Sequence, residues 1–236
     1  MLNPKYTITS TILSKTAEIA EIKAAVERSR VLPLNEAQLR RQAILRMAHT
    51  STSIEGNKLA QFEVGKVLEG KSVRAPQKDI LEVENYLNGL KLLDELSKSS
   101  HNLILKEILK THKVVIAGLV DQDKVGAIRP ADVYVLDDLG DGREMLRFKA
   151  PPASRVPKLL TDLLDWLKTA KEESIHPIII AGIFHLEFVS IHPFTDGNGR
   201  VARLLTQLLL YRLGWDFRKI IVLEDYYNQN RLAYYN

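Results

Sequence analysis

Twelve consecutive residues in the C-terminal part of the chain combine the residue types that phosphate chemistry needs. They run from His192 to Arg203 and spell His-Pro-Phe-Thr-Asp-Gly-Asn-Gly-Arg-Val-Ala-Arg. Gly197 and Gly199 let the backbone turn, so that several N–H groups can face one anion at the start of a helix. Arg200 and Arg203 fall in the first turn of that helix, where the helix dipole disfavours cations. A multi-phosphate group, which arginine binds in bidentate fashion, would explain both.

Two further side chains in this segment suit a reaction on phosphate. Asp196 would be repelled beside an anion site unless a cation joined it, and Mg²⁺ is commonly held by one carboxylate together with phosphate oxygens. His192 can take a proton from an attacking hydroxyl near pH 7. Phe194 is expected to anchor the loop by packing against the core. Each residue alone is usually a turn or a solvated side chain, but their concentration in twelve residues favours a functional site.

Other kinds of site are disfavoured by what surrounds these residues. The spacing Gly197-X-Gly199-X-X-Ala202 matches a dinucleotide fingerprint, but a helix precedes it and no βαβ unit surrounds it. The pair His185-X-Glu187 resembles part of a zinc deaminase site, but the chain has no cysteine to complete it. His185 is therefore predicted to be a core-facing histidine on the helix before the loop.

Composition sets broad limits on the class of protein. The 236 residues are 45% hydrophobic and 26% charged, which is typical of a globular domain. The absence of cysteine excludes a disulfide framework and fits a reducing compartment, so a cytoplasmic location is expected. No segment is apolar for long enough to suggest a membrane span. The net charge of +4 is spread along the chain, so nucleic-acid binding is not implied.

Helical periodicity dominates the sequence and predicts an all-α fold with one β-hairpin. Asn35 and Gln38 are interpreted as a capping box that opens the second helix, which should end at Gly56. Ser154 is interpreted as the N-cap of a later helix. The hairpin is predicted from two apolar runs, 132–136 and 145–149, around a Gly/Asp-rich turn at 137–142. Helices are expected at about 10–30, 35–55, 77–97, 101–119, 154–171, 177–190, 198–213 and 225–235, and a short helix that ends at 68 is expected after the second of these.

The segment from His192 to Arg203 also matches the Fic signature at every fixed position. Gly126-Ala-Ile-Arg129, the hairpin after it and Pro151-Pro152 follow in an order that resembles the Fic core. The chain is therefore similar to the Fic family from about residue 77 to its end. The resemblance implies a helical Fic-fold bundle with a hairpin flap at about 130–150. It divides the chain into an N-terminal helical region, 1–75, and a catalytic core, 76–236.

The family resemblance implies a protein adenylyltransferase, which moves AMP from ATP to a Ser, Thr or Tyr hydroxyl of a target protein. His192 would be the general base, and Asp196 would hold Mg²⁺. Arg203 would contact the γ-phosphate, and Tyr234 would line the nucleoside pocket. The remaining implied roles are phosphate binding by Gly197, Asn198, Gly199 and Arg200, and target docking on the flap by Val133, Tyr134, Val135 and Leu136.

The stretch Ser51-X-X-X-Glu55-Gly56 matches an inhibitory motif that many Fic proteins carry, here placed N-terminal to the core. The resemblance implies that Glu55 pairs with Arg203 and takes the place of the γ-phosphate, with Ser51 steadying the helix end. Some relatives use the equivalent glutamate to remove AMP, so a hydrolase or a bifunctional enzyme stays an alternative. Transfer from another phosphate position and a non-catalytic nucleotide-binding adaptor are further alternatives. Self-modification and a homodimer are left open by the sequence.

Overall fold

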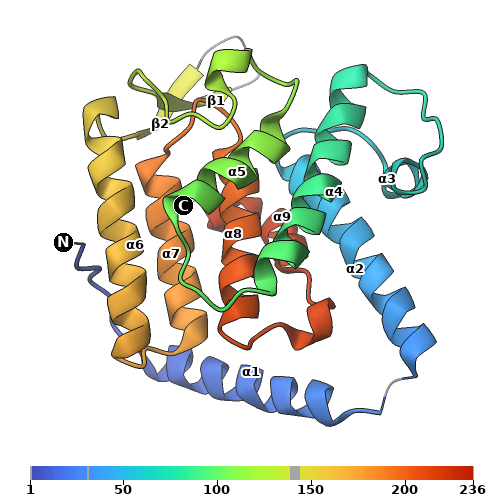
Figure 1. Cartoon of the computed structure of the whole chain (residues 1–236), viewed down its shortest axis with the longest axis vertical. Helices are drawn as coiled ribbons and strands as arrows, with labels where there is room; N and C mark the ends of the chain where they lie inside the picture. Colours follow the sequence, from blue (N-terminus) through green and yellow to red (C-terminus); the bar gives the residue numbers. More distant parts are fainter. Residues whose placement is uncertain (1, 31, 139–143, 236) are drawn as a thin grey trace.

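The computed structural model describes residues 2–30, 32–138 and 144–235, with the backbone alone over 135–138 and 144–147. Helices form most of this part of the chain, and one two-stranded hairpin completes it (Figure 1). The predicted fold class is confirmed. In chain order the elements are α1 (Ser10–Arg28), α2 (Pro33–Ile54), α3 (Gln61–Leu68), α4 (Gln77–Ser97), α5 (Leu105–Ile116), η1 (Gln122–Lys124), β1 (Tyr134–Asp138), β2 (Glu144–Lys149), η2 (Ala153–Arg155), α6 (Val156–Glu172), α7 (Pro177–Ile191), α8 (Asn198–Arg212), η3 (Phe217–Lys219), α9 (Leu223–Gln229) and α10 (Arg231–Tyr235).

Helix α8 occupies the centre of the molecule and packs against α4, α5 and α7 (Figure 1). Its leucines and Val201 are buried, as expected for a helix that is covered on most sides. Polar side chains are buried with them, in particular Arg200, Arg203 and Thr206. Burying a charged group costs free energy unless the group is paired with an opposite charge or binds a ligand. The N-terminal half of α8 is therefore the candidate functional site.

Helix α2 is exposed over its first half and buried over its second half. Ala43, Met47 and Ala48 belong to the same buried cluster as side chains of α4 and α8. The helix ends where Gly56 adopts a left-handed conformation, φ +95°, which confirms the predicted stop. The buried half of α2 thus delivers Ser51 and Glu55 to the N-terminal half of α8. The division of the chain at residue 75 stays a prediction.

Two predicted helix starts are wrong. Helix α2 begins at Pro33, with Leu32 as its N-cap, and not at a capping box on Asn35. Proline at the first helical position has the helical φ already fixed, which moves the start two residues upstream. Helix α6 begins at Val156 after the short η2 turn, so Ser154 lies within that turn and is not the N-cap.

Two other predicted helices have different bounds. Helix α5 covers 105–116 only, because the Glu107 carboxylate accepts the N–H of Ile104 at its start and Gly118, φ +70°, follows its end. The last predicted helix is split into α9 and α10 at Asn230, whose backbone is not helical (φ −119°, ψ 42°). Both short helices lie against the C-terminal half of α2.

The predicted hairpin is present, but its first strand is shifted: β1 covers Tyr134–Asp138, so residues 132 and 133 lie before the strand and residues 137 and 138, predicted in the turn, belong to it. Strands β1 and β2 are antiparallel, with Tyr134 opposite Lys149 and Asp138 opposite Glu144, and a bulge interrupts the register after Val135. The predicted turn residues from 139 onward lie outside the described part. The hairpin projects at one end of the bundle, beyond the start of α8 (Figure 1).

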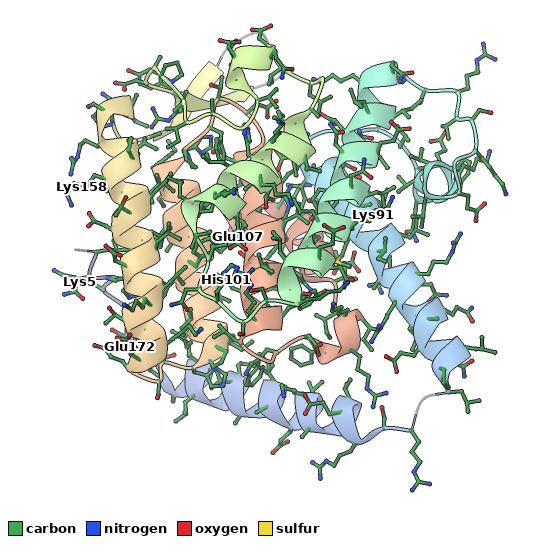
Figure 2. The ribbon with its side chains drawn as sticks, in the orientation of Figure 1. Lys5, Lys91, His101, Glu107, Lys158 and Glu172 are labelled. Atoms are coloured by element: carbon green, nitrogen blue, oxygen red, sulfur yellow. The ribbon has the colours of Figure 1, made fainter. Side chains whose placement is uncertain are left out.

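The opposite end of α8 is held by a buried ion pair. Arg212 donates to the Glu107 carboxylate of α5 at 2.7 and 3.0 Å, and His101 lies 3.5 Å from the same carboxylate (Figure 2). Helix α1 crosses the lower end of the bundle, where Arg218 donates to the carbonyls of Glu27 and Ser29. In the ranges that the structure describes, no helix combines the length and the apolar character needed to cross a membrane.

Candidate active site

The loop from His192 to Gly197 connects α7 to α8 and turns sharply at both ends. His192 ends α7 in a left-handed conformation (φ 50°, ψ 62°), and Gly197 starts α8 in another (φ 81°, ψ 4°). A left-handed conformation is uncommon for a residue other than glycine, and such residues cluster at functional sites. The turn at His192 directs the chain away from the axis of α7 and toward the N-terminus of α8.

The Asn198 side chain closes this loop from within. Its Oδ1 accepts the N–H of Phe194 at 2.9 Å, and its Nδ2 donates to the Phe194 carbonyl at 2.8 Å. Both atoms of the amide are therefore engaged with the backbone four residues earlier. Phe194 is fully buried and stacks on His112 of α5, with ring centroids 3.7 Å apart. Phe194, the predicted anchor of the loop, thus packs on the ring of His112. The Asn198 side chain stabilises the loop conformation through its two hydrogen bonds to Phe194.

His112 is a site residue that sequence reasoning missed. Its Nδ1 accepts the N–H of Gly126, and its Nε2 donates to the Asp196 carbonyl at 3.1 Å. Because one ring nitrogen accepts and the other donates, the ring is neutral, and burial lowers its pKa to about 4. Nothing in the spacing of the α5 residues distinguished this histidine from an ordinary helix position.

His192 has the protonation state that a general base requires. Its Nδ1 lies 3.2 Å from the Val189 carbonyl, which can only accept, so Nδ1 carries the hydrogen. Burial lowers the pKa of the imidazole, the Val189 carbonyl opposes this in part, and the Arg129 charge lowers the pKa further against weaker opposing effects of Glu55 and Asp196. The neutral ring therefore keeps a lone pair on Nε2 at neutral pH.

Asp196 and Arg200 lie together at the start of α8. The Asp196 Oδ1 accepts from the N–H of Gly197 at 2.5 Å and from Arg200 Nη2 at 3.0 Å. Arg200 is buried, and its Nη1 lies 3.4 Å from Glu82 of α4, which is held in turn by the Asn57 amide at 2.9 Å. Among the described residues, the Arg200 Nε and Nη1 have no hydrogen-bond partner.

The donor set at Asp196 fits a magnesium ion held mainly by substrate. The Asp196 side chain is 49% exposed, and the structure brings no group of three or more His, Cys, Asp or Glu residues together within the described ranges. Magnesium commonly uses one or two carboxylates and takes its other ligands from phosphates and water. Asp196 is therefore the residue that would hold the ion, with phosphate oxygens completing its coordination.

The guanidinium of Arg203 donates hydrogen bonds to residues at the C-terminal end of α2. Its Nε donates to Ser51 Oγ at 2.7 Å, and its Nη2 donates to the Ser51 carbonyl at 3.0 Å and to Glu55 Oε1 at 2.7 Å. Burial lowers the pKa of this guanidinium, but the Glu55 carboxylate and the nearby Tyr234 and Tyr86 raise it by more, so it stays charged. The structure thus brings together the three residues that the sequence assigned to an inhibitory contact.

The Glu55 carboxylate lies directly over Gly199 in the first turn of α8. A Cβ at Gly199 would lie 2.5 Å from Glu55 Oε1 and 3.1 Å from Arg203 Nη1. Glu55 therefore occupies the space in front of the positive helix N-terminus, where an anion is favoured. Its side chain is 28% exposed, so this end of the site is open to solvent.

The Tyr234 hydroxyl of α10 accepts directly from Arg203 and is linked through His185 to Thr206 of α8. Thr206 donates to the Ala202 carbonyl, so its oxygen accepts from His185 Nδ1 at 2.9 Å. His185 Nε2 then accepts from the Tyr234 hydroxyl at 3.0 Å, and Arg203 Nη1 lies 3.4 Å from the same hydroxyl. His185 is thus a satisfied internal histidine, as predicted.

The hairpin supplies the predicted docking residues at the edge of this site. Tyr134 begins β1 with its side chain 52% exposed, and Val133 precedes the strand. For Val135 and Leu136 the structure describes the backbone only, which places both in β1. The flap role of these residues stays a prediction.

Comparison with known proteins places this arrangement in a family. A crystal structure of a Fic family protein from Desulfovibrio desulfuricans G20 superposes with a TM-score of 0.81, at 34% identity, over 99% of this chain and 67% of that one. The Fic/DOC family model matches residues 102–210. The chain belongs to the Fic/DOC family. The predicted resemblance is confirmed.

Named relatives of this Fic chain include adenylyltransferases. Protein adenylyltransferase fic-1 of Caenorhabditis briggsae is 35% identical over 183 residues, which cover 75% of this chain and 33% of that protein. Protein adenylyltransferase Fic of Nematostella vectensis is 32% identical over 189 residues, which cover 78% of this chain and 41% of that protein. The chain spans about a third of the length of the first of these relatives and two fifths of the second.

Proposed function

We propose that this Fic chain is a protein adenylyltransferase that Glu55 keeps in a restrained state. The relatives named above carry that activity in their names. The observation that carries the proposal is that His192, which keeps a lone pair on Nε2, begins the loop that leads into the start of α8, where Arg200 and Arg203 are buried. We propose that these two arginines and the start of α8 form an anion site beside the imidazole. A base beside a phosphate site is what transfer to a hydroxyl requires.

The anion site supports binding of a triphosphate. Arg200 and Arg203 bring two buried guanidinium groups to the first two turns of α8, where the helix N-terminus adds its own attraction for an anion. Arg200 Nε and Nη1 are buried and make no hydrogen bond to any described residue, although Nη1 lies 3.4 Å from Glu82, so a ligand that supplies an acceptor would be favoured here. Gly199 has no side chain to block approach to the backbone. Tyr234, stacked on Tyr227 beside Arg203, is proposed to line the nucleoside pocket.

The proposed reaction is a displacement at the α-phosphorus of ATP. The target hydroxyl oxygen forms a bond to the α-phosphorus while His192 Nε2 takes its proton. The bond from the α-phosphorus to the oxygen that bridges to the β-phosphate breaks, and pyrophosphate leaves. A Mg²⁺ ion held at Asp196 would neutralise charge on the phosphates. The flap residues Val133–Leu136 are proposed to hold the target segment by strand addition.

The proposed restraint is competition for Arg203. The Glu55 carboxylate takes the guanidinium donor that a γ-phosphate would use, and it fills the space over Gly199. An ATP molecule that binds beside Glu55 cannot place its phosphates in the same way, because like charges repel. Removing Glu55 is therefore expected to admit the triphosphate and raise the rate of AMP transfer.

Removal of AMP from a modified protein is a second candidate function for the same site. Glu55 is partly exposed and lies within the site, so its carboxylate is placed where it can hold a water molecule. The water oxygen would form a bond to the phosphorus of the AMP ester while the bond from phosphorus to the protein hydroxyl oxygen breaks. AMP is released, and the protein hydroxyl regains its proton. The chain would then be a hydrolase or a bifunctional enzyme.

Labelled ATP distinguishes these activities. Wild type, Glu55→Gly and Glu55→Gly/His192→Ala are incubated with Mg²⁺ and ATP labelled at either the α- or the γ-phosphate. Transfer of AMP predicts that Glu55→Gly protein takes up the α-label on itself or on added proteins, and that removing His192 abolishes it. Uptake of the γ-label would instead show phosphoryl transfer, and no uptake with intact ATP binding would indicate an adaptor.

A matched control and a chase complete the test. His101→Ala removes an exposed histidine at the opposite end of α8 and should leave uptake unchanged. Adding wild-type chain to purified, labelled Glu55→Gly protein tests hydrolysis. Release of AMP that depends on Glu55 would favour the hydrolase over a simple restraint.

A further inference from the structure

Arg129 contacts the catalytic loop and both ends of the hairpin with one side chain. Its Nε donates to the His192 carbonyl at 2.7 Å, its Nη1 to the Ala131 carbonyl at 2.8 Å and its Nη2 to the Pro151 carbonyl at 2.5 Å. Its backbone N–H also donates to the Pro193 carbonyl at 2.9 Å. These acceptors belong to three separate segments, which are brought together around one guanidinium.

The environment of Arg129 is unusual for a structural arginine. The residue is 2% exposed, and in the described part of the chain it forms no ion pair. Burial lowers the pKa of its guanidinium, and the Asp132 charge opposes this only in part. A buried cation that is satisfied by neutral carbonyls costs free energy that an apolar side chain would not. The fork of several N–H donors explains why arginine is needed here, since one side chain donates to three separate carbonyls.

The contact at His192 fixes a strained residue. His192 adopts φ 50°, and its carbonyl points to Arg129 Nε, so the peptide after the imidazole is held in one orientation. The backbone bond from Arg129 to Pro193 adds a second tie at the next residue. The position of Nε2 relative to the start of α8 therefore depends on Arg129.

The other two contacts fix the base of the hairpin. Ala131 lies three residues before β1, and Pro151 lies two residues after β2. Binding both carbonyls to one guanidinium holds the two hairpin ends together and at a set distance from His192. A strand that adds to the hairpin would then be held in fixed register with the imidazole.

We propose that Arg129 is a positioning residue that sets the general base and the target-docking flap in one geometry. This inference rests on the proposed function. A positioning role differs from a role in folding alone, because it makes the rate of transfer depend on the orientation of His192. The proposed nucleotide site at Arg200 and Arg203 does not involve Arg129, so nucleotide binding should not depend on it.

Two variants separate the charge of Arg129 from its geometry. They are made in the Glu55→Gly background, where transfer can be measured. Arg129→Gln removes the charge and the three-way fork. Arg129→Lys keeps the charge but offers a single ammonium in place of the planar fork. Arg155→Gln is the matched control, since Arg155 is exposed and lies close to Pro151 in the chain.

Three readouts are compared with the Glu55→Gly parent. They are the rate of self-modification with α-labelled ATP, the Kd for Mg²⁺ and a non-hydrolysable ATP analogue, and the pKa of His192 from histidine NMR, assigned with His192→Ala. The charges that face the imidazole are Arg129, Asp196 and, in wild type, Glu55. Glu55 is absent from all of these proteins, so a difference in the pKa reports Arg129.

The proposal predicts a rate loss without a loss of binding. Both variants should incorporate label about 100-fold more slowly, as expected for a base displaced by about 1 Å, with the Kd changed by less than about threefold. The pKa of His192 should rise in Arg129→Gln and stay near the parental value in Arg129→Lys. If Arg129→Gln does not fold, the rate and Kd of Arg129→Lys carry the test.

Several results would overturn the inference. They are parental rates in both variants, full recovery of the rate in Arg129→Lys, or a Kd that weakens in step with the rate. Absence of incorporation in the Glu55→Gly parent would instead contradict the proposed function. In that case the pKa of His192 in Arg129→Gln would still test the contact between Arg129 and His192. A pKa equal to that of the parent would contradict this contact.

Discussion

Arg203 of α8 donates a 2.7 Å hydrogen bond to Glu55 at the end of α2, although 148 positions separate them in the chain. Ser51 accepts from the same guanidinium through its hydroxyl and its carbonyl. The arginine is buried, so a change in its partners has a large energetic effect. Any ligand that takes Arg203 must replace the Glu55 contact, so the proposed binding of nucleotide at Arg203 would be coupled to the position of α2.

Gly199→Ala tests whether Glu55 fills the space over α8. A Cβ at this position would lie 2.5 Å from the Glu55 carboxylate, while the backbone of Gly199 is helical and accepts alanine. We predict that Gly199→Ala lowers the free energy of unfolding by about 1–3 kcal/mol in wild type. In the Glu55→Gly background the loss should largely vanish. Urea unfolding of the four proteins gives this double-mutant cycle.

Gly182→Ala is the control for that cycle. Gly182 is also helical, on α7, and a Cβ there would meet nothing within 4 Å. Its effect should be the same with and without Glu55. A penalty for Gly199→Ala that is equal in both backgrounds would mean that Glu55 does not occupy this space in solution.

Asn198→Asp tests the clamp that closes the signature loop. The substitution keeps the acceptor for the Phe194 N–H but replaces the donor to the Phe194 carbonyl with an oxygen. Two acceptors then face each other in a buried place, which costs about 1–3 kcal/mol. We expect the unfolding midpoint to fall, and AMP transfer by the Glu55→Gly protein to fall with it.

Calorimetry and the label assay check this prediction together. Asn88→Asp is a suitable control, because Asn88 is exposed on α4. An Asn198→Asp protein with unchanged stability and full activity would show that the clamp is not needed for the loop.

His112→Gln tests a contribution to stability that depends on pH. The unfolded state binds a proton on this histidine near pH 6.5, whereas burial lowers its folded pKa to about 4. Between these values the unfolded state holds more protons, so stability falls as the pH falls. The stabilisation is complete above pH 6.5, and about 3 kcal/mol is lost by pH 4.

Glutamine can donate to the Asp196 carbonyl and accept from Gly126, but it does not titrate in this range. We therefore predict that the wild type loses more stability than His112→Gln between pH 7 and pH 4.5. Urea midpoints at both values measure the difference. Parallel losses in the two proteins would contradict a buried neutral His112.

Local signals in the sequence predicted much of this structure. Glycines that end helices are recognisable because their left-handed conformation excludes most other residues, and the stop at Gly56 was predicted correctly. The span of α4 was predicted to the residue, since Pro76 precedes it and its apolar positions follow the helical period. The start of α2 was predicted wrongly because the sequence offers two start signals, a capping box at Asn35 and a proline at Pro33. The helix begins at the proline.

The long-range part of the site had no local signal. His112 acts through Phe194 and Asp196, more than 80 positions away, and Arg129 acts through His192 and Pro151. Glu82 approaches Arg200 from another helix. Such partners become visible only when the helices are packed, because nothing in the spacing along one helix records its neighbours. The contacts of Ser51 and Glu55 with Arg203 were predictable only through the family motif.

The rate of AMP transfer by Glu55→Gly, compared with wild type, tests the central claim most directly. A charge-assisted hydrogen bond contributes about 1.5–3 kcal/mol, so its loss should raise transfer from α-labelled ATP about 10- to 100-fold. Glu55→Gln should lie between the two, and Glu69→Gly, which removes an exposed carboxylate on another helix end, should match wild type. Equal or lower transfer by a folded Glu55→Gly protein that still binds ATP would contradict the account.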